Sequence, residues 1–85
     1  MKPAKLLERV RSGQLANVDF ADLVRLVEAL GFGLARVSGS HRIYLHPEVA
    51  EMLCLQPFRG DAKPYQIRQL VTLVEVYNLS LRGRE

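Results

Sequence analysis

The sequence predicts a two-layer α+β domain, in which two helices cover one face of a three-stranded antiparallel sheet. Apolar residues recur at helical spacing in residues 19–30 and 64–78, and three short segments with the character of strands lie between them. A further short helix is expected at residues 4–11. The chain has 85 residues, 48% of them apolar and 25% charged, which is typical of one compact globular domain. Because so small a core leaves little room for a cavity, we expect a functional site in a shallow surface cleft.

The ends of the two long helices are marked by specific residues. Asp19 is a good N-cap for the first helix, and Gly31 is a typical C-terminal stop. The second is expected to begin at Pro64, because proline suits the first helical position, and to end near Asn78. The residues expected to be buried on these helices are Phe20, Leu23, Val24, Val27, Leu30, Ile67, Leu70, Val71, Val74 and Tyr77.

Residues 32–37 and 40–46 predict a β-hairpin with a two-residue turn at Ser38-Gly39. This register places Arg36 opposite His41, with both side chains at the rim of the helix-covered face. His41 is therefore expected to be half sheltered. The residues expected under the helices are Phe32, Leu34, Ile43 and Leu45, and those expected on the other face are Arg42, Tyr44 and His46.

A third strand is expected at residues 50–56, followed by a loop over residues 57–63 that contains Gly60. The single cysteine, Cys54, lies in an apolar run of this strand, so we expect a small buried thiol and no intrachain disulfide. This cysteine usage suits a reducing cytoplasm. No segment approaches 18 uninterrupted apolar residues, and charges interrupt the apolar stretch near Met1, so neither membrane insertion nor secretion is expected.

Positive charge is concentrated in one part of the chain. Twelve Lys and Arg residues against nine Asp and Glu residues give a net charge of +3, and no acidic residue lies in residues 29–47. A locally positive surface suits RNA or an acidic partner, but it also describes an ordinary solvated face. One cysteine and two histidines without paired spacing predict neither a metal site nor a cofactor. The basic residues of this stretch are Arg36, His41, Arg42 and His46.

Two motifs occur in order along the chain. Gly31-Phe32 is followed by Gly39-Ser40-His41-x-Ile43-Tyr44-x-His46-Pro47, and Gly60-x-Ala62-Lys63-Pro64-Tyr65-Gln66-x-Arg68-Gln69 comes later. Over roughly residues 19–79 the chain resembles the HicA (YcfA-like) family of messenger-RNA interferase toxins, with a leader at residues 1–18 and a polar tail at residues 80–85. The resemblance implies a fold similar to double-stranded-RNA-binding domains and translation-independent cleavage of RNA. It also implies neutralisation by a HicB antitoxin in a heteromeric complex of a type II toxin–antitoxin system.

His41 is the candidate catalytic residue. Metal-independent RNA cleavage proceeds by attack of a 2′-hydroxyl on the adjacent phosphorus, which needs a base for that proton and positive charge near the phosphorane. A histidine is mostly neutral at pH 7, and a neighbouring Arg36 would favour the neutral form. The expected register sends His46 to the opposite sheet face, which leaves water or a cation as the acid for the departing oxygen.

Several side chains are candidates for contact with RNA. Lys63 stands at the start of a helix, where backbone N–H groups and the helix dipole attract phosphate. Tyr44 is either a stacking platform for unpaired bases or a simple packing residue. Gly39 is expected to serve the turn through a positive φ, while Gln66 and Gln69 are as well suited to contact an antitoxin. The RNA- or phosphate-binding candidates are Arg36, Ser40, Arg42, Tyr44, His46, Lys63 and Arg68.

Two other functions are compatible with the same residues. A histidine after a Gly-Ser turn is more often an exposed hairpin residue than a catalytic one, and the loop before Pro64 is equally an ordinary helix cap. The chain could therefore be a noncatalytic RNA-binding module of the same fold, or a protein-interaction domain with a basic face. Only the first of these predicts salt-sensitive RNA binding without cleavage.

Overall fold

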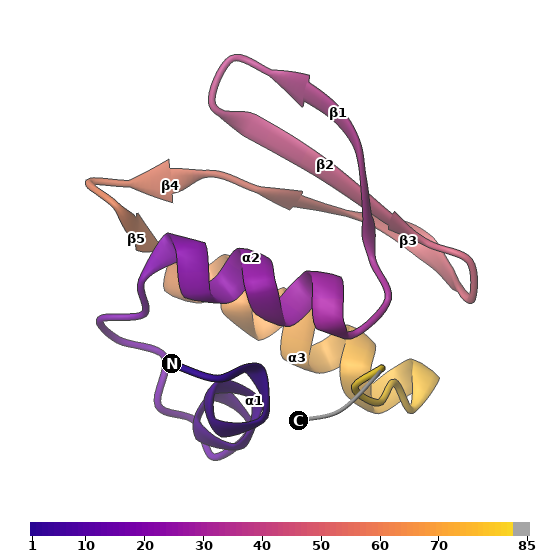
Figure 1. Cartoon of the computed structure of the whole chain (residues 1–85), viewed down its shortest axis with the longest axis horizontal. Helices are drawn as coiled ribbons and strands as arrows, with labels where there is room; N and C mark the ends of the chain where they lie inside the picture. Colours follow the sequence, from indigo (N-terminus) through magenta and orange to yellow (C-terminus); the bar gives the residue numbers. More distant parts are fainter. Residues whose placement is uncertain (83–85) are drawn as a thin grey trace.

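The computed structural model describes residues 1–82, in which two helices cover one face of a three-stranded antiparallel sheet (Figure 1). An additional helix lies on the far side of these two helices. The α+β class, the order of helix, three strands and helix, and the extra N-terminal helix are confirmed. The elements are α1 (Pro3–Arg11), α2 (Phe20–Ala29), β1 (Gly33–Ser38), β2 (His41–His46), β3 (Val49–Leu55), β4 (Pro57–Phe58), β5 (Asp61–Ala62) and α3 (Pro64–Tyr77).

Both long helices begin and end as their sequences predict. The Asp19 carboxylate accepts a hydrogen bond of 2.8 Å from the Ala21 N–H and so caps α2. Pro64 is the first residue of α3, and Asn78 ends that helix in the left-handed conformation with φ 52°. The end of α3 is also held to β3, because the Tyr77 hydroxyl donates a 2.6 Å hydrogen bond to Glu51. This hydrogen bond raises the pKa of Tyr77.

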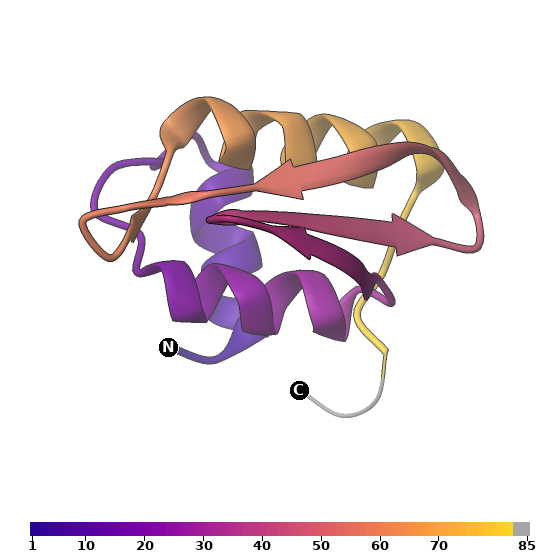
Figure 2. The same cartoon turned by 90° about the horizontal axis from the view of Figure 1, so that it is seen from above.

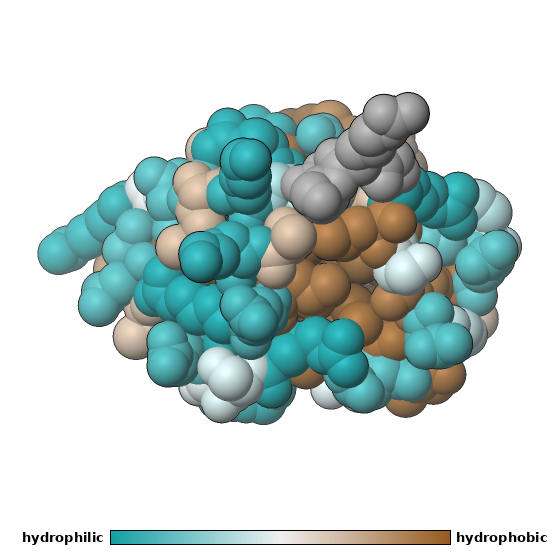
Figure 3. All heavy atoms as spheres, turned by 60° about the horizontal axis from the view of Figure 1, so that its bottom comes forward, coloured by the Kyte–Doolittle hydropathy of each residue, from teal (hydrophilic) through white to brown (hydrophobic). Residues whose placement is uncertain are grey.

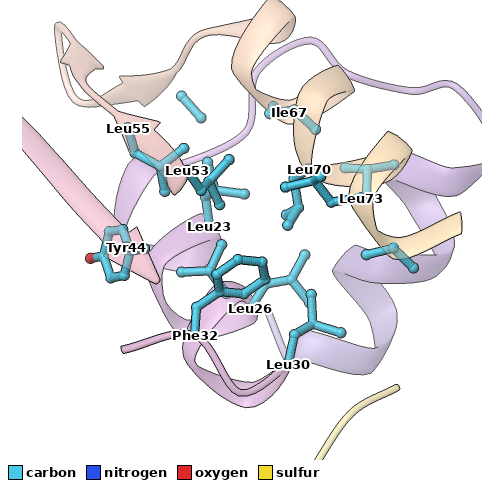
Figure 4. Packing of buried hydrophobic residues seen from close by; sticks show 14 of the residues in the cluster. Leu23, Leu26, Leu30, Phe32, Tyr44, Leu53, Leu55, Ile67, Leu70 and Leu73 are labelled. Carbon is cyan, nitrogen blue, oxygen red and sulfur yellow. The ribbon is translucent and has the colours of Figure 1, made fainter. Parts of the chain in front are cut away.

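The core lies between the sheet and the pair α2 and α3, which lie side by side and run in the same direction (Figures 1 and 2). Leu26 and Leu73 belong to this core although the sequence did not single them out. Val24, Val71 and Tyr77 are only partly buried and pack around it. Side chains from both helices and the sheet meet in the centre (Figure 4), among them Leu23, Leu26, Leu30, Phe32, Tyr44, Leu53, Leu55, Ile67 and Leu70.

The turn between β1 and β2 differs by one residue from the expected one. Ser38 pairs with His41, so the two-residue loop is Gly39-Ser40, and Gly39 has φ +61°. A type II′ turn takes glycine at its first central position, and this preference explains why the loop starts at Gly39. The expected pairing of Arg36 with His41 is therefore wrong.

The face of β2 that meets the helices is also the opposite of the expected one. Tyr44 is fully buried, whereas Leu45 is 51% exposed and Ile43 is half-buried. Tyr44 pairs with Leu53 of β3, and paired residues share a face, so the buried leucines of β3 draw Tyr44 inward. β2 has apolar residues on both faces, and its own pattern does not decide which face is covered. The residues found on the open face or exposed instead of under the helices are Leu34, Ile43 and Leu45.

Cys54 also differs from its expected buried position. It pairs with Ile43, shares the open face of the sheet and is half-buried rather than buried. The alternation of β3 places its neighbours Leu53 and Leu55 in the core, which leaves Cys54 on the other side.

The expected loop at residues 57–63 contains a small hairpin, β4 and β5, in which Phe58 pairs with Asp61. The segment before α2 lies against it: the Ala62 N–H donates to the Val18 carbonyl at 2.7 Å, and the Phe20 N–H donates to the Gly60 carbonyl at 2.9 Å. The start of α2 thus holds the hairpin that leads into α3.

α1 forms a third layer behind α2 and α3 (Figure 1). Leu6 and Val10 are 1% and 2% exposed, so this leader helix shares the core of the domain. Apolar side chains reach the surface on the side that carries α1 (Figure 3). Leu81, in the segment expected to be a polar tail, is partly buried against the core; residues 83–85 of that segment lie outside the described part.

Gly31, the predicted stop of α2, has φ +105°, and a Cβ there would lie 2.8 Å from Nε2 of His46. We expect Gly31→Ala to lower the free energy of unfolding by about 2 kcal/mol or more, because it combines backbone strain with a steric clash. Urea denaturation measures the change. Gly33→Ala is the matched control, because no atom lies within 4 Å of its Cβ and its φ is not positive; we expect a change within about 0.5 kcal/mol. Equal effects of the two substitutions would contradict this account.

Candidate nucleic-acid interface

Both sequence motifs meet at one end of the molecule. The Gly39-Ser40 turn, the end of β3, the β4–β5 hairpin and the start of α3 lie at the left in Figure 1. The two motifs are brought together because β2 and β3 are antiparallel, so that β2 begins where β3 ends. The short β4–β5 hairpin then connects the end of β3 to Lys63.

His41 is exposed at the beginning of β2. It pairs with Ser38 of β1 on one side. On the other side, Arg42 pairs with Leu55, so one further step in the same register places His41 opposite Gln56. Tyr44 faces the helices, and Arg42 shares that face because side chains alternate along a strand. The same alternation directs His41 to the open face of the sheet. The predicted half-sheltered rim position is wrong, and the imidazole is open to a large substrate.

Arg36 shares the open face with His41, although the two residues are not paired. A bulge between Leu34 and Arg36 shifts the register, so that Arg36 pairs with Ile43. Arg36 is thereby a diagonal neighbour of His41, at a spacing that is about 7–8 Å in ordinary antiparallel sheets. A guanidinium and the candidate base therefore stand on the same surface.

A hydrogen-bonded side chain connects the two motifs. The amide of Gln56 donates from Nε2 to Ser40 Oγ at 2.9 Å, and its Oε1 accepts from Lys63 Nζ at 3.1 Å. Ser40 belongs to the Gly-Ser-His turn and Lys63 precedes α3, so one glutamine joins the turn to the start of the helix. The sequence alone does not identify Gln56 as a functional residue, because a lone glutamine before a proline carries no recognisable signal.

Gln66 supports this arrangement from α3. It is 4% exposed, its Oε1 accepts a 3.0 Å hydrogen bond from the Gln56 N–H, and its Nε2 donates to the Tyr65 hydroxyl at 3.3 Å. These contacts leave Gln66 little surface for a partner, whereas Gln69 is exposed. Arg68 is exposed one turn after Tyr65, on the same side of the helix.

Tyr44 and His46 do not lie in this surface. Both were expected to face outward, but they face the helices, and Tyr44 has no exposed surface on which a base could stack. The ring of His46 packs edge-to-face against Phe32, with centroids 5.0 Å apart and planes at 71°. Its Nε2 lies 3.0 Å from the Leu30 carbonyl and its Nδ1 accepts from the Glu48 N–H at 3.0 Å. Both ring nitrogens are thus used inside the domain.

Arg42 is half-buried, and its guanidinium carbon lies 5.8 Å from the centroid of the Phe20 ring. This cation–π contact directs it toward the start of α2, away from the face that carries His41. Among residues 1–82, no three His, Cys, Asp or Glu side chains are grouped as metal ligands, and none of the helices is long and apolar enough to cross a membrane.

A family model described as the HicA toxin of bacterial toxin-antitoxin matches residues 20–75. The matched segment runs from the first residue of α2 almost to the end of α3, so it contains the whole sheet and the candidate surface. It defines the class of the protein, a toxin of a toxin–antitoxin system. The chain belongs to the HicA toxin family, which confirms the resemblance carried by the two motifs. No curated protein and no solved structure matches the chain.

The two histidines are expected to differ in their effect on stability. His46→Ala leaves the Leu30 carbonyl and the Glu48 N–H without their partner and opens a cavity beside Phe32, so we expect a loss of about 2–4 kcal/mol. His41→Ala removes an exposed side chain, and we expect a change within about 0.5 kcal/mol. Urea denaturation of both variants tests this. A His46 variant as stable as wild type would show that the ring is not a structural residue.

The Tyr44 hydroxyl is buried without a hydrogen-bond partner within residues 1–82. A buried hydroxyl that makes no hydrogen bond destabilises the fold, so we expect Tyr44→Phe to be neutral or to raise the free energy of unfolding by about 1 kcal/mol. Thermal denaturation measures the change. A clear loss of stability would reveal a hydrogen bond that the structure does not show.

Proposed function

We propose that this toxin is an endoribonuclease that cleaves messenger RNA in the cytoplasm with His41 as general base. The single observation that supports the proposal most strongly is the Ser40–Gln56–Lys63 connection, which unites the two motif segments around an exposed histidine. Because Arg36, His41 and Arg68 are all exposed, this surface suits a polymer better than a small molecule.

RNA supplies its own nucleophile, so the protein has to provide a base and positive charge. His41 takes the proton of a 2′-hydroxyl while the 2′-oxygen forms a bond to the adjacent phosphorus. The bond from phosphorus to the 5′-oxygen then breaks, and water protonates the leaving oxygen. The products are a 2′,3′-cyclic phosphate and a free 5′-hydroxyl. His46 takes no part, because its ring is buried and fully hydrogen-bonded.

Cationic and hydroxyl groups around His41 stabilise the charge that develops on the phosphorane. Arg36 supplies a guanidinium on the same sheet face, and Lys63 supplies an ammonium that Gln56 connects to Ser40. Arg68 lies further along α3 and binds a neighbouring phosphate. Gly39 permits the tight turn through its positive φ and makes no contact of its own with RNA.

The second partner in this proposal is a HicB-type antitoxin, which forms a heteromeric complex with the toxin. The matched family pairs such toxins with antitoxins. A surface with exposed cations and no acidic residue in residues 29–47 favours a partner with acidic side chains, because opposite charges raise the rate of association.

His41→Ala tests the catalytic role. We expect it to reduce cleavage of single-stranded RNA by about 10²-fold or more and to abolish growth arrest on expression, with the fold unchanged. Mass spectrometry of the wild-type products should show 2′,3′-cyclic phosphate ends, and a 2′-deoxy nucleotide at the cut site should prevent cleavage. Equal growth arrest by wild type and variant would refute a catalytic His41. RNA binding without cleavage would instead indicate a noncatalytic module, and the absence of salt-sensitive RNA binding a protein-interaction domain.

A further inference from the structure

Gln56 lies at the centre of the candidate surface. It follows the last residue of β3, stands opposite His41 in the continued strand register, and contacts Ser40 and Lys63 through one amide group. Its backbone N–H is held by the side chain of the buried Gln66. The position of the Gln56 backbone is therefore set by α3, while its side chain reaches back to the hairpin turn.

The direction of each hydrogen bond follows from the chemistry of the partners. An ammonium group has only donors, so the atom of Gln56 that contacts Lys63 must be the oxygen. The amide nitrogen then faces Ser40 and donates to its hydroxyl oxygen. Lys63 thus settles the orientation of the amide. Without it, the oxygen and the nitrogen of the amide could exchange places.

The directions of these hydrogen bonds leave donors available on both Ser40 and Lys63. Because Ser40 Oγ accepts from Gln56, its hydroxyl hydrogen is available to donate, and Lys63 retains two of its three N–H donors. Within residues 1–82, neither group has another side-chain hydrogen bond. Ser40 directly precedes His41, and Lys63 is joined to it through Gln56, so both remaining sets of donors suit an anionic oxygen bound at this turn.

We propose that Gln56 is a positioning residue, which orients the Ser40 hydroxyl and the Lys63 ammonium so that both donate to the RNA phosphate beside His41. The inference rests on the proposed function and names the part of the surface that binds phosphate. Gln56 itself acts through its two neighbours and makes no contact with the reacting atoms.

The substitution Gln56→Glu separates this role from simple packing. The glutamate side chain has the same shape, but both of its oxygens accept, so it takes the hydroxyl hydrogen of Ser40 and a full ion pair with Lys63. The Ser40 hydroxyl is then turned away from RNA, and the added negative charge offsets the positive charge of Lys63. Gln14→Glu is the matched control, because it adds the same charge at an exposed position after α1, outside the candidate surface.

Binding of a fluorescent single-stranded RNA oligonucleotide, measured in a His41→Ala background that leaves the RNA intact, tests the inference. We expect Gln56→Glu to weaken binding about 10- to 100-fold and to lower the salt dependence by about one charge, with Gln14→Glu within about twofold of the parent. With His41 present, Gln56→Glu should lower kcat as well as raise KM, because the same donors stabilise the phosphorane. Urea denaturation checks that the variants remain folded.

A double-mutant cycle provides a second measurement that does not depend on added charge. Gln56→Leu and Ser40→Ala should each weaken RNA binding, and the double variant should lose less than the sum of the two, since both disrupt the same contact. Unchanged binding in Gln56→Glu, or strict additivity in the cycle, would overturn the inference. If wild type binds RNA without cleaving it, the proposed function fails, yet these effects on binding still test the role of Gln56. If it binds no RNA, both proposals are refuted.

Discussion

The pairing of β2 with its two neighbours controls where the candidate side chains of this strand lie. On one side the Gly39-Ser40 turn places His41 opposite Ser38, and on the other side the buried leucines of β3 draw Tyr44 into the core. Because side chains alternate along a strand, burying Tyr44 sends His41 outward. His46, two residues beyond Tyr44, is buried by the same alternation, and the backbone groups around it satisfy both of its ring nitrogens. One strand thus carries a structural histidine at one end and an exposed histidine at the other.

The second motif is joined to the first where β3 ends, because a side chain of α3 replaces a strand as the partner of the next backbone N–H. β3 ends at Leu55, and the next N–H, that of Gln56, is satisfied by the side chain of Gln66 from α3. The side-chain amide of Gln56 then bridges Ser40 and Lys63. The β4–β5 hairpin, held by the segment before α2, closes the path between Gln56 and Lys63. The leader is therefore connected to the candidate surface through the domain, although the matched family segment begins only at residue 20.

The charge of this surface suits both of the proposed partners, an RNA and an acidic protein. Arg36 is separated by more than 25 residues from Lys63 and Arg68 along the chain, but the elements that carry them meet at one end of the sheet. α3 begins at the same end, and the positive end of its dipole adds to the side-chain charges. An open basic surface of this kind attracts a polyanion, and it attracts an acidic protein for the same electrostatic reason.

By itself, the sequence determined the helices, the caps at Asp19 and Asn78, the α+β class and the family, because helical periodicity, capping residues and spaced motifs are local properties of the chain. It also identified His41 and Lys63 as candidates. Tertiary structure alone decided which face of β2 is buried. Both faces carry apolar residues, and the pairing of Tyr44 with the buried Leu53 of β3 selects one of them. For the same reason, the inward position of His46 could not be predicted. The sequence placed Arg36 and His41 on one face, but it gave no sign of the bulge in β1 that makes them diagonal rather than paired neighbours. Gln56 became visible only in the fold, since its role consists of contacts with residues 16 positions earlier and 7 positions later in the chain.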